Sequence, residues 1–334
     1  PAPGKRQHAR TPREPGVSWL GRPRLPDGGP DLEGRLWTPG LKEGVAPGSP
    51  FHLTEYFGPV LGIMTAATLD EAIALQNAVP FGLTGGIHSL DDAEVERWLD
   101  AVQVGNAYVN RHITGAIVQR QSFGGWKQSA VGPGAKAGGP NYVAQLGRWS
   151  DAPDTSTSAS ASGTDSTHDA VPPAREAAPE AWLAWAKADD ARWWEREFSV
   201  GHDPSGLHVE ANVFRYRPVD VLTVRVGADA LPVEVERVLH AARTAGVPAV
   251  VVPSTGDAAV SDGEFARRVA SGAVRGRVRV VGSAPGLHEA AAERVGEVTV
   301  LDHPVVASGR RELLTVFHEQ AVSRTTHRYG HVKR

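Results

Sequence analysis

The residues that could do chemistry gather in a glycine-rich run, residues 114–127, directly after a short strand-like apolar run, residues 106–110. Ser122 and Ser129 are the nearest candidate nucleophiles, but no G-x-S-x-G elbow or obvious base accompanies them. The chain contains no cysteine, which excludes disulfides, thiolate metal sites and cysteine nucleophiles within it. Read alone, a glycine-rich segment after a strand is a surface loop. The run therefore carries no supported nucleophile of its own.

Three further patterns fall short of a phosphate, metal or nucleotide site. Residues 132–140 are glycine-rich but lack the Walker spacing and its Ser or Thr, which favours a tight connection. Only His327 and His331 share an i, i+4 spacing, and no carboxylate is placed beside them, so we predict no metal site. No GxGxxG follows the strand-like residues 221–226. A dinucleotide fingerprint is therefore missing where a doubly wound fold would place one.

Composition and charge indicate a globular protein of roughly two domains. The 334 residues are 41% hydrophobic and 22% charged, which suits an ordinary buried core. A formal net charge of −3 gives no overall field that would favour nucleic acid or an anionic membrane, and we interpret the basic clusters at both ends as solvated termini. No apolar run reaches the roughly 18 residues that span a bilayer, and no apolar segment follows the basic N-terminal stretch. We expect a cytoplasmic protein.

The elements that must position the glycine-rich run alternate between strand and helix. Residues 58–64 are typical of a buried strand, and a capping signal at Thr68 predicts a helix over residues 69–79. A second capping signal, at Ser89, opens another helix, which precedes a strand at residues 107–109. This alternation implies a parallel or mixed sheet.

The chain changes character after residue 151. Up to about residue 180 it is rich in Ser, Thr, Ala, Asp and Pro and almost devoid of large apolar residues, which predicts a flexible linker. Beyond the linker, strand-like and helical runs alternate, and we predict a doubly wound, Rossmann-like sheet. Its predicted strands are residues 221–226, 249–252, 278–281 and 298–300. A last helix is predicted at about residues 310–323.

Residues 54–60, Thr-Glu-Tyr-Phe-Gly-Pro-Val, resemble the Glu-x-Phe-Gly-Pro-Val signature of the aldehyde dehydrogenase superfamily. The resemblance implies that Glu55 accepts hydrogen bonds from the nicotinamide ribose hydroxyls of NAD and that Phe57 packs beside the nicotinamide. A carboxylate suits a diol, because it only accepts hydrogen bonds and both bonds are charge-assisted. Read alone, this motif is an exposed strand entrance; the later motifs, at matching order and spacing, favour the functional interpretation.

The glycine-rich run gives a narrower match. With its Thr-Gly-Ala-Ile-Val, its Phe-Gly-Gly-Trp-Lys and the later Gly-Gly-Pro-Asn-Tyr, it resembles the pyrroline-5-carboxylate dehydrogenase branch, which oxidises L-glutamate γ-semialdehyde to glutamate. In that branch Gly115 and Ala116 would donate backbone N–H groups to the substrate's α-carboxylate. Phe123 would pack on its aliphatic chain. Backbone donors to a charged group each contribute on the order of 1.5 to 3 kcal/mol. His112 and Ser122 depart from the Gly and Pro expected there and could alter the loop's geometry.

Residues 214–218 and 319–330 resemble the C-terminal extension of bifunctional proline utilization A proteins, in which a proline dehydrogenase domain that uses FAD comes first. The resemblance implies an α/β fold in three parts. Residues 1–149 would be the C-terminal part of an aldehyde dehydrogenase catalytic domain, and residues 150–180 a flexible linker. Residues 181–334 would be a Rossmann-like domain of the aldehyde dehydrogenase superfamily with a lid-like tail.

The implied function is the C-terminal portion of an NAD-dependent L-glutamate γ-semialdehyde dehydrogenase of proline catabolism. The family's Cys nucleophile, Glu base and dinucleotide-binding domain would lie before Pro1, so we assign no catalytic residue and expect the chain alone to be inactive. Its partners would be L-glutamate γ-semialdehyde and the remainder of the enzyme, with no nucleic acid and no membrane span. Residues 142–149 would continue as a strand of the flap that this family uses for oligomerisation, which allows a homo-oligomer. The alternative is a non-enzymatic dimerisation or regulatory module derived from the enzyme's tail.

Overall fold

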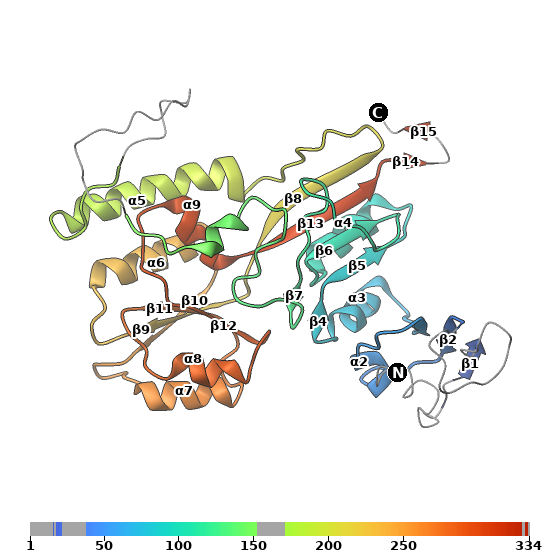
Figure 1. The fold of residues 1–334 in the computed structure, drawn as a ribbon, viewed down its shortest axis with the longest axis horizontal. Coiled ribbons are helices and arrows are strands. Elements are labelled where there is room, and N and C mark those ends of the chain that lie inside the picture. The colour runs from blue at the N-terminus through green and yellow to red at the C-terminus, as the bar shows by residue number, and fades with distance from the viewer. Residues whose placement is uncertain (1–15, 17, 22–37, 152–170, 329–330, 333–334) are drawn as a thin grey trace. The chain divides into compact units, whose positions relative to one another are not determined.

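The computed structural model of the chain describes residues 16, 18–21, 38–151, 171–328 and 331–332 (Figure 1). Its internal contacts divide the chain into two compact units. Unit 1 comprises residues 1–80 and 90–103, and unit 2 comprises residues 81–89 and 104–334. Unit 1 contains a three-stranded sheet, and unit 2 contains two four-stranded sheets.

Unit 1 contains a three-stranded sheet in the order β1-β2-β3. Strand β1 (Ser18–Gly21) runs antiparallel to β2 (Gly40–Glu43), and β2 runs parallel to β3 (Val60–Ile63). Strand β3 confirms the strand predicted at residues 58–64. Its residues are half-buried or exposed rather than buried, because it forms an edge of this sheet. The short helix α2 (Pro50–Leu53) leads into the segment that carries Glu55 and Phe57.

Helices α3 (Leu69–Asn77) and α4 (Asp92–Ala101) both begin at a side-chain cap. As predicted, the Thr68 hydroxyl accepts a backbone N–H of the first turn of α3, at 3.1 Å. The prediction of Ser89 as the cap of α4 is wrong. The cap is Asp91, whose carboxylate directly precedes the helix and accepts one of its unpaired N–H groups at 2.7 Å.

Four strands of unit 2 form a mixed sheet in the order β5-β6-β13-β8. They are β5 (Thr84–Ile87), β6 (Asn106–Val109), β13 (Phe317–Thr325) and β8 (Glu210–Pro218). Strand β6 runs parallel to both β5 and β13, whereas β13 and β8 pair antiparallel along their whole length. Figure 1 shows the red β13 lying between the yellow β8 and the green β6. The sheet therefore joins strands that are far apart in the sequence.

The helix predicted at residues 310–323 is wrong over most of its length. Only α9 (Gly309–Glu312) and a following 3₁₀ turn, η3 (Leu313–Val316), are helical, and β13 begins at once. Strand β13 has a partner on each side, so its backbone N–H and C=O groups are satisfied by pairing. Its Ala321 and Val322 are buried within the unit. Tertiary pairing thus overrides the local pattern that suggested a helix.

A second sheet of unit 2 is parallel throughout, in the order β10-β9-β11-β12. Its strands are β9 (Leu222–Val226), β10 (Ala249–Pro253), β11 (Gly276–Val281) and β12 (Val298–Leu301). The helices between them are α6 (Pro232–Thr244), α7 (Asp262–Ala270) and α8 (Leu287–Ala292). All four predicted strands are present, and the Rossmann-like prediction is confirmed.

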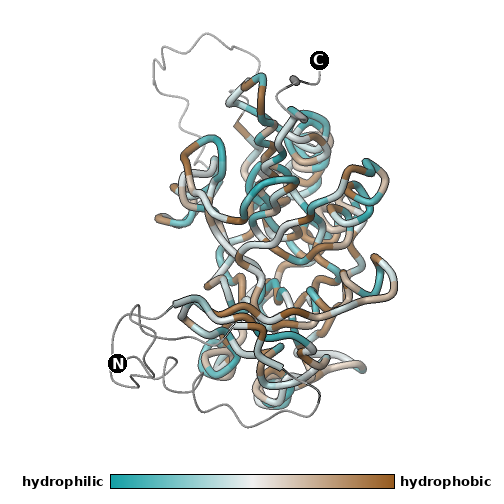
Figure 2. Tube along the Cα trace, turned by 90° about the vertical axis from the view of Figure 1, so that its right-hand side faces the viewer, coloured by the Kyte–Doolittle hydropathy of each residue, from teal (hydrophilic) through white to brown (hydrophobic). Residues whose placement is uncertain are grey.

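Helix α5 (Pro179–Trp193) and a π-helical turn, η2 (Trp194–Phe198), supply aromatic side chains to the core of unit 2. Trp182 is fully buried, and the Phe198 ring stacks on Phe317 with centroids 5.2 Å apart. Figure 2 shows hydrophobic and hydrophilic residues interspersed along the trace, as expected for elements that bury one face.

The predicted strand and the predicted domain boundaries in the middle of the chain have different outcomes. Residues 142–149 are not a strand: they contain a 3₁₀ turn, η1 (Val143–Leu146). The boundaries proposed at residues 149/150 and 180/181 stay a prediction, but unit 2 extends across both, because β6 pairs with β13. Most of the predicted linker, residues 152–170, lies outside the described residues.

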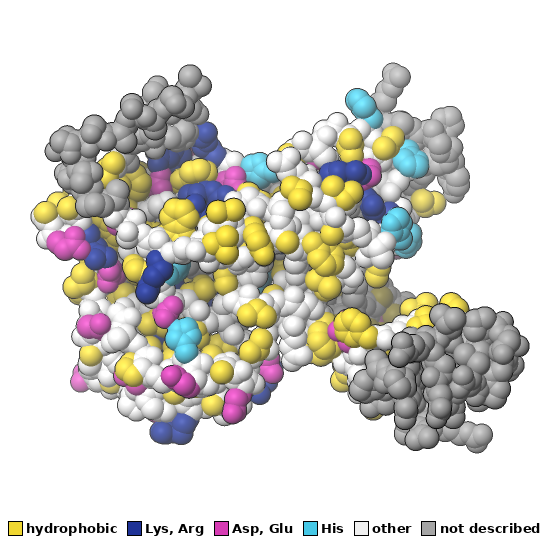
Figure 3. All heavy atoms as spheres, in the orientation of Figure 1, with side chains coloured by type: hydrophobic (Ala, Val, Ile, Leu, Met, Phe, Trp, Pro, Cys, Tyr) yellow, Lys and Arg dark blue, Asp and Glu magenta, His cyan; other side chains and the backbone are white. Residues whose placement is uncertain are grey.

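The described residues contain neither a membrane-spanning helix nor a metal-binding cluster. None of the helices in this part of the chain is both long and apolar enough to cross a membrane. The same residues contain no group of three His, Cys, Asp or Glu side chains that could hold a metal ion. On the face drawn in Figure 3, acidic and basic side chains are interspersed.

Candidate substrate-anchoring loop

The glycine-rich loop is fastened to the start of β6 by one buried side chain, Asn106. Asn106 Nδ2 donates to the Ser122 carbonyl at 3.0 Å, and Oδ1 accepts the Gly124 N–H at 3.1 Å. Lys136 Nζ donates to the same Oδ1 at 3.1 Å and to the Gly124 carbonyl at 2.5 Å. These bonds hold the backbone on both sides of Phe123 and so fix the position from which its ring projects.

Lys136 is a lysine with no exposed surface. Burial lowers the pKa of its ammonium group to about 7, while the charge of Glu319 acts in the opposite sense. The Glu319 carboxylate, on β13, accepts the Lys136 backbone N–H at 2.8 Å and Asn141 Nδ2 at 2.7 Å. Burial raises the pKa of the Glu319 carboxyl. Strand β13 is therefore bonded to the segment that grips the loop.

Two positions in this frame require glycine because of close backbone approach. A Cβ on Gly105 would stand 1.9 Å from the Gly124 carbonyl oxygen, and one on Gly125 would stand 2.4 Å from the Ser129 Cβ. After these glycines, β7 (Trp126–Lys127) pairs antiparallel with β4 (Phe81–Gly82). The C-terminal end of the loop, strand β7, is thus held by its pairing with β4.

Gly115 and Ala116 are exposed near the tip of the loop. Gly115 has a φ of 125°, a conformation that favours glycine, and its carbonyl accepts the Tyr108 hydroxyl at 2.8 Å. Within the described part of the chain, neither the Gly115 nor the Ala116 N–H donates to a protein acceptor. Both amides can therefore donate to a bound ligand.

The two ends of this tip are tied to β8 by ion pairs to one carboxylate. Arg111 Nη1 lies 2.8 Å from Glu210 Oε2, and Arg120 Nη2 lies 2.5 Å from Glu210 Oε1. Burial opposes ionisation of Glu210, but the hydrogen bond and charge of Arg111, together with the charge of Arg120, hold its pKa below the ordinary value. A charge-assisted clamp therefore limits how far the loop can open.

Phe123 is half-buried and exchanges two backbone hydrogen bonds with Ala137, at 3.0 and 2.9 Å. Ser122, which stands where the branch has Pro, is buried and donates its hydroxyl to the Gly138 carbonyl at 3.1 Å. Because this hydroxyl proton is donated to a backbone carbonyl of the loop, Ser122 is unsuited to act as a nucleophile. His112, the other departure from the branch, is exposed.

Glu55 and Phe57 lie on an exposed segment of unit 1. The Phe57 side chain is 80% exposed, whereas Tyr56 between them stacks on Phe51 with ring centroids 5.0 Å apart. An acceptor-only carboxylate and an aromatic face are therefore both presented to solvent. The structure thus groups the predicted residues in two sets: Glu55 with Phe57 in unit 1, and Gly115, Ala116 and Phe123 on one loop of unit 2.

The residues that frame the loop were not among the predicted site residues. Lys136 had a usable signal, because it is the one charged residue between Lys127 and Arg148 in a glycine-rich stretch. Glu319 and Glu210 had none, since their partners lie 183 and 99 positions away.

Residues 21–149 match the model of the family described as Aldehyde dehydrogenase family. The 1-pyrroline-5-carboxylate dehydrogenase of Bacillus cytotoxicus is 40% identical over 116 residues, which are 35% of this chain and 22% of the relative. That of Bacillus pumilus is 40% identical over 123 residues, 36% of this chain and 24% of the relative. The chain thus spans less than a quarter of these curated relatives.

Among solved structures, proline utilization A from Corynebacterium freiburgense is similar to almost the whole chain. The TM-score is 0.78 and the sequence identity 45%, over 99% of this chain and 31% of that one. The resemblance that the sequence motifs indicated, to aldehyde dehydrogenases and to proline utilization A, is therefore confirmed. An aldehyde dehydrogenase superfamily fold with mixed α/β sheets is confirmed as well.

Proposed function

We propose that the chain is the C-terminal portion of an NAD-dependent L-glutamate γ-semialdehyde dehydrogenase of proline catabolism, within a bifunctional protein whose proline dehydrogenase domain uses FAD. The observation that carries the proposal is a pair of backbone N–H groups, at Gly115 and Ala116, that donate to no described residue and lie on a loop fixed by Asn106. Two relatives that are 40% identical over 116 and 123 residues are named 1-pyrroline-5-carboxylate dehydrogenase.

Substrate preference follows from the chemistry of this loop. Two backbone donors to the α-carboxylate contribute together on the order of 3 to 6 kcal/mol before desolvation is counted. The ring of Phe123 offers an apolar surface to the aliphatic chain of the substrate. An amino-acid aldehyde is therefore favoured over a plain alkyl aldehyde, which has no carboxylate to anchor.

The residues of unit 1 fit a nicotinamide dinucleotide. The exposed Glu55 carboxylate would accept hydrogen bonds from the ribose diol, and the exposed Phe57 ring would pack beside the nicotinamide. NAD, when bound, supplies the hydride acceptor for aldehyde oxidation. The roles of Glu55 and Phe57 are to bind and orient.

The chain alone is predicted not to oxidise aldehydes, because it contains no cysteine to attack the carbonyl carbon. The purified chain would be incubated with L-glutamate γ-semialdehyde and NAD, and NADH absorbance followed. The 1-pyrroline-5-carboxylate dehydrogenase of Bacillus pumilus is the positive control. Robust NADH formation by the chain alone would refute this part of the proposal.

Carboxylate binding by the loop can be tested without turnover. Backbone amide signals of Gly115 and Ala116 would be followed by NMR during titration with L-glutamate and with its α-amide, L-isoglutamine. We expect selective shifts with glutamate, and their loss in Ala116→Pro, which removes one donor. Val118→Ala, at an exposed position of the same loop, is the matched control. Equal shifts with both ligands would contradict carboxylate recognition.

The DNA upstream of the codon for Pro1 separates the enzyme from the alternative module. An open frame that encodes a Cys-containing catalytic loop supports the proposal. A ribosome-binding site and start codon there would favour a non-enzymatic dimerisation or regulatory module.

A further inference from the structure

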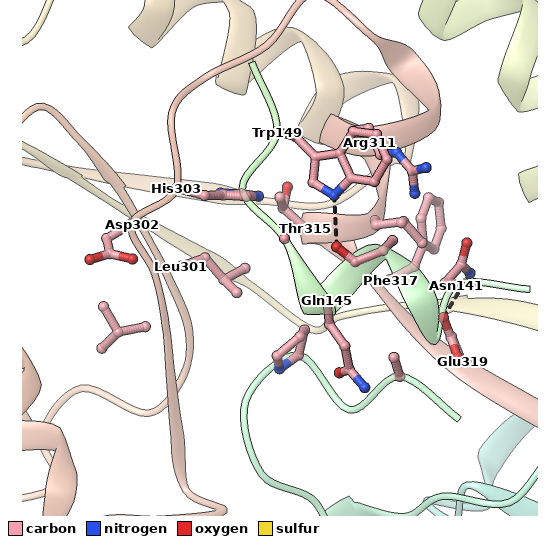
Figure 4. Close-up of a pocket in the computed structure, with 16 residues that line it drawn as sticks. Asn141, Gln145, Trp149, Leu301, Asp302, His303, Arg311, Thr315, Phe317 and Glu319 are labelled. Carbon is pink, nitrogen blue, oxygen red and sulfur yellow. Dashed lines mark hydrogen bonds between the residues drawn. The ribbon is translucent and has the colours of Figure 1, made fainter. Parts of the chain in front are cut away.

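A cavity of about 330 Å³ opens against the carboxyl end of β12 in unit 2 (Figure 4). Its walls come from residues 133–149, residues 300–303 and residues 311–319. Much of the wall is apolar, formed by Leu301, Leu314 and Phe317 among others. In Figure 4, the Arg311 and His303 side chains lie on opposite sides of this space. A concave, largely apolar space with a few convergent polar groups is the usual form of a small-molecule site.

The unsatisfied charge in this cavity is positive. Both acidic groups of the wall have partners: Asp302 accepts His288 Nε2 at 2.8 Å, and Glu319 accepts hydrogen bonds from Lys136 and Asn141. Arg311 is half-buried, and its guanidinium has neither a hydrogen bond nor an ion pair among the residues that the structure describes. Burial, with the charge of the neighbouring arginine, lowers the pKa of this guanidinium. An anion would offset that cost.

The guanidinium is held in place before any ligand arrives. It lies over the Trp149 ring, 3.7 Å from the centroid, and the indole N–H donates to the Ala144 carbonyl at 2.7 Å. On the opposite wall, His303 Nδ1 is buried without a partner in the described part of the chain. Burial lowers the pKa of His303, so this imidazole is neutral at pH 7 and available for one hydrogen bond.

The more usual position for a ligand on such a sheet is filled by protein. Ligands of open parallel sheets bind where the strand order reverses, here between β9 and β11. There the Asp229 carboxylate accepts the backbone N–H and the hydroxyl of Ser283, both at 2.8 Å. A Cβ on Gly282 would stand 2.6 Å from that carboxylate. The space beside the edge strand β12 remains open.

We propose that the cavity beside β12 binds a small organic acid, with its carboxylate on Arg311 and its apolar body against Leu301, Leu314 and Phe317. The planar guanidinium presents paired donors that match a carboxylate. The cavity is at the lower end of the usual range of roughly 300 to 1,000 Å³, which suits a single small ring or a short chain. This site is separate from the loop tip at Gly115.

Isothermal titration of the 334-residue chain with 3-phenylpropanoate and with its uncharged analogue 3-phenylpropanamide tests the site. We expect the acid to bind at least tenfold more tightly than the amide. Arg311→Gln should abolish that difference, and Arg268→Gln, at an exposed arginine on α7, should preserve it. Leu301→Phe should weaken both ligands by narrowing the apolar wall, and circular dichroism would confirm that each variant is folded.

Three outcomes would overturn the proposal. The acid and the amide could bind equally, the acid could fail to bind at roughly 10 mM, or Arg311→Gln could leave the tenfold preference intact. Ala116→Pro separates the two proposals, because it removes a donor of the loop and should leave binding of 3-phenylpropanoate unchanged. Loss of binding in that variant would place the acid at the loop and refute the second site.

Discussion

Replacing Lys136 by Met tests whether burial lowers the pKa of this ammonium group as far as its surroundings indicate. The side chain has no exposed surface, and its pKa is lowered from 10.5 to about 7, chiefly by burial. Met keeps most of the volume and removes the titrating group. The variant therefore isolates the part of the pH dependence of stability that belongs to Lys136.

The sign and size follow from proton binding. Between pH 7 and 10.5 the unfolded chain holds a proton on Lys136 that the folded chain has largely released, so the free energy of unfolding rises with pH. The slope approaches about 1.4 kcal/mol per pH unit, or about 2 kcal/mol from pH 7.5 to 9. The raised pKa of the Glu319 carboxyl acts with the opposite sign at lower pH, because its folded form retains a proton longer.

Urea unfolding at several pH values between 7.5 and 9, followed by tryptophan fluorescence, measures this slope. The wild-type chain should gain about 2 kcal/mol over that range, and Lys136→Met should be nearly flat. Lys187→Met, at a lysine that pairs with Glu236 on the surface, is the control and should keep the wild-type slope. Equal slopes for the wild type and Lys136→Met would refute the assignment of a lowered pKa to Lys136.

The remaining predictions concern how unit 2 holds its loop and core. Gly105→Ala should destabilise the chain by about 3 kcal/mol or more in thermal unfolding, because the new Cβ meets the Gly124 carbonyl at 1.9 Å. Asp190→Asn should cost about 3 to 5 kcal/mol, since it leaves the fully buried Arg237 without its carboxylate partner at 2.7 Å; a cost below 1 kcal/mol would contradict this. Glu210→Gln should speed hydrogen exchange across the loop tip while the melting temperature changes little, because it releases both arginines from their shared carboxylate.

Elements with strong local signals could be predicted from the sequence. The four parallel strands of the Rossmann-like sheet are short valine-rich runs separated by helical patterns, and each lies where its run predicts. Thr68 caps its helix for an equally local reason. Strand β13 could not be read in this way, because its conformation is set by β6 and β8, which come from distant segments.

The residues of the candidate site also differ in whether a local sequence pattern identifies them. Gly115, Ala116 and Phe123 came from a motif that lies within one short run of residues. The groups that hold that run, among them Asn106, are ordinary polar residues whose role depends on what the fold brings beside them. A motif therefore indicates what a loop binds, and tertiary contacts decide whether the loop is held in place.

The C-terminal half of the chain is consequently part of the loop's support. Glu319 on β13 bonds to the backbone of Lys136, whose ammonium group bonds to the Gly124 carbonyl, while Glu210 on β8 pairs with arginines on both sides of the loop tip. If β13 and β8 formed a module of their own, these bonds would be absent. Because the loop is bonded to both strands, its geometry is coupled to the folding of the C-terminal half. That coupling gives the C-terminal half, in which no GxGxxG follows β9, a physical reason to accompany the candidate substrate-anchoring loop.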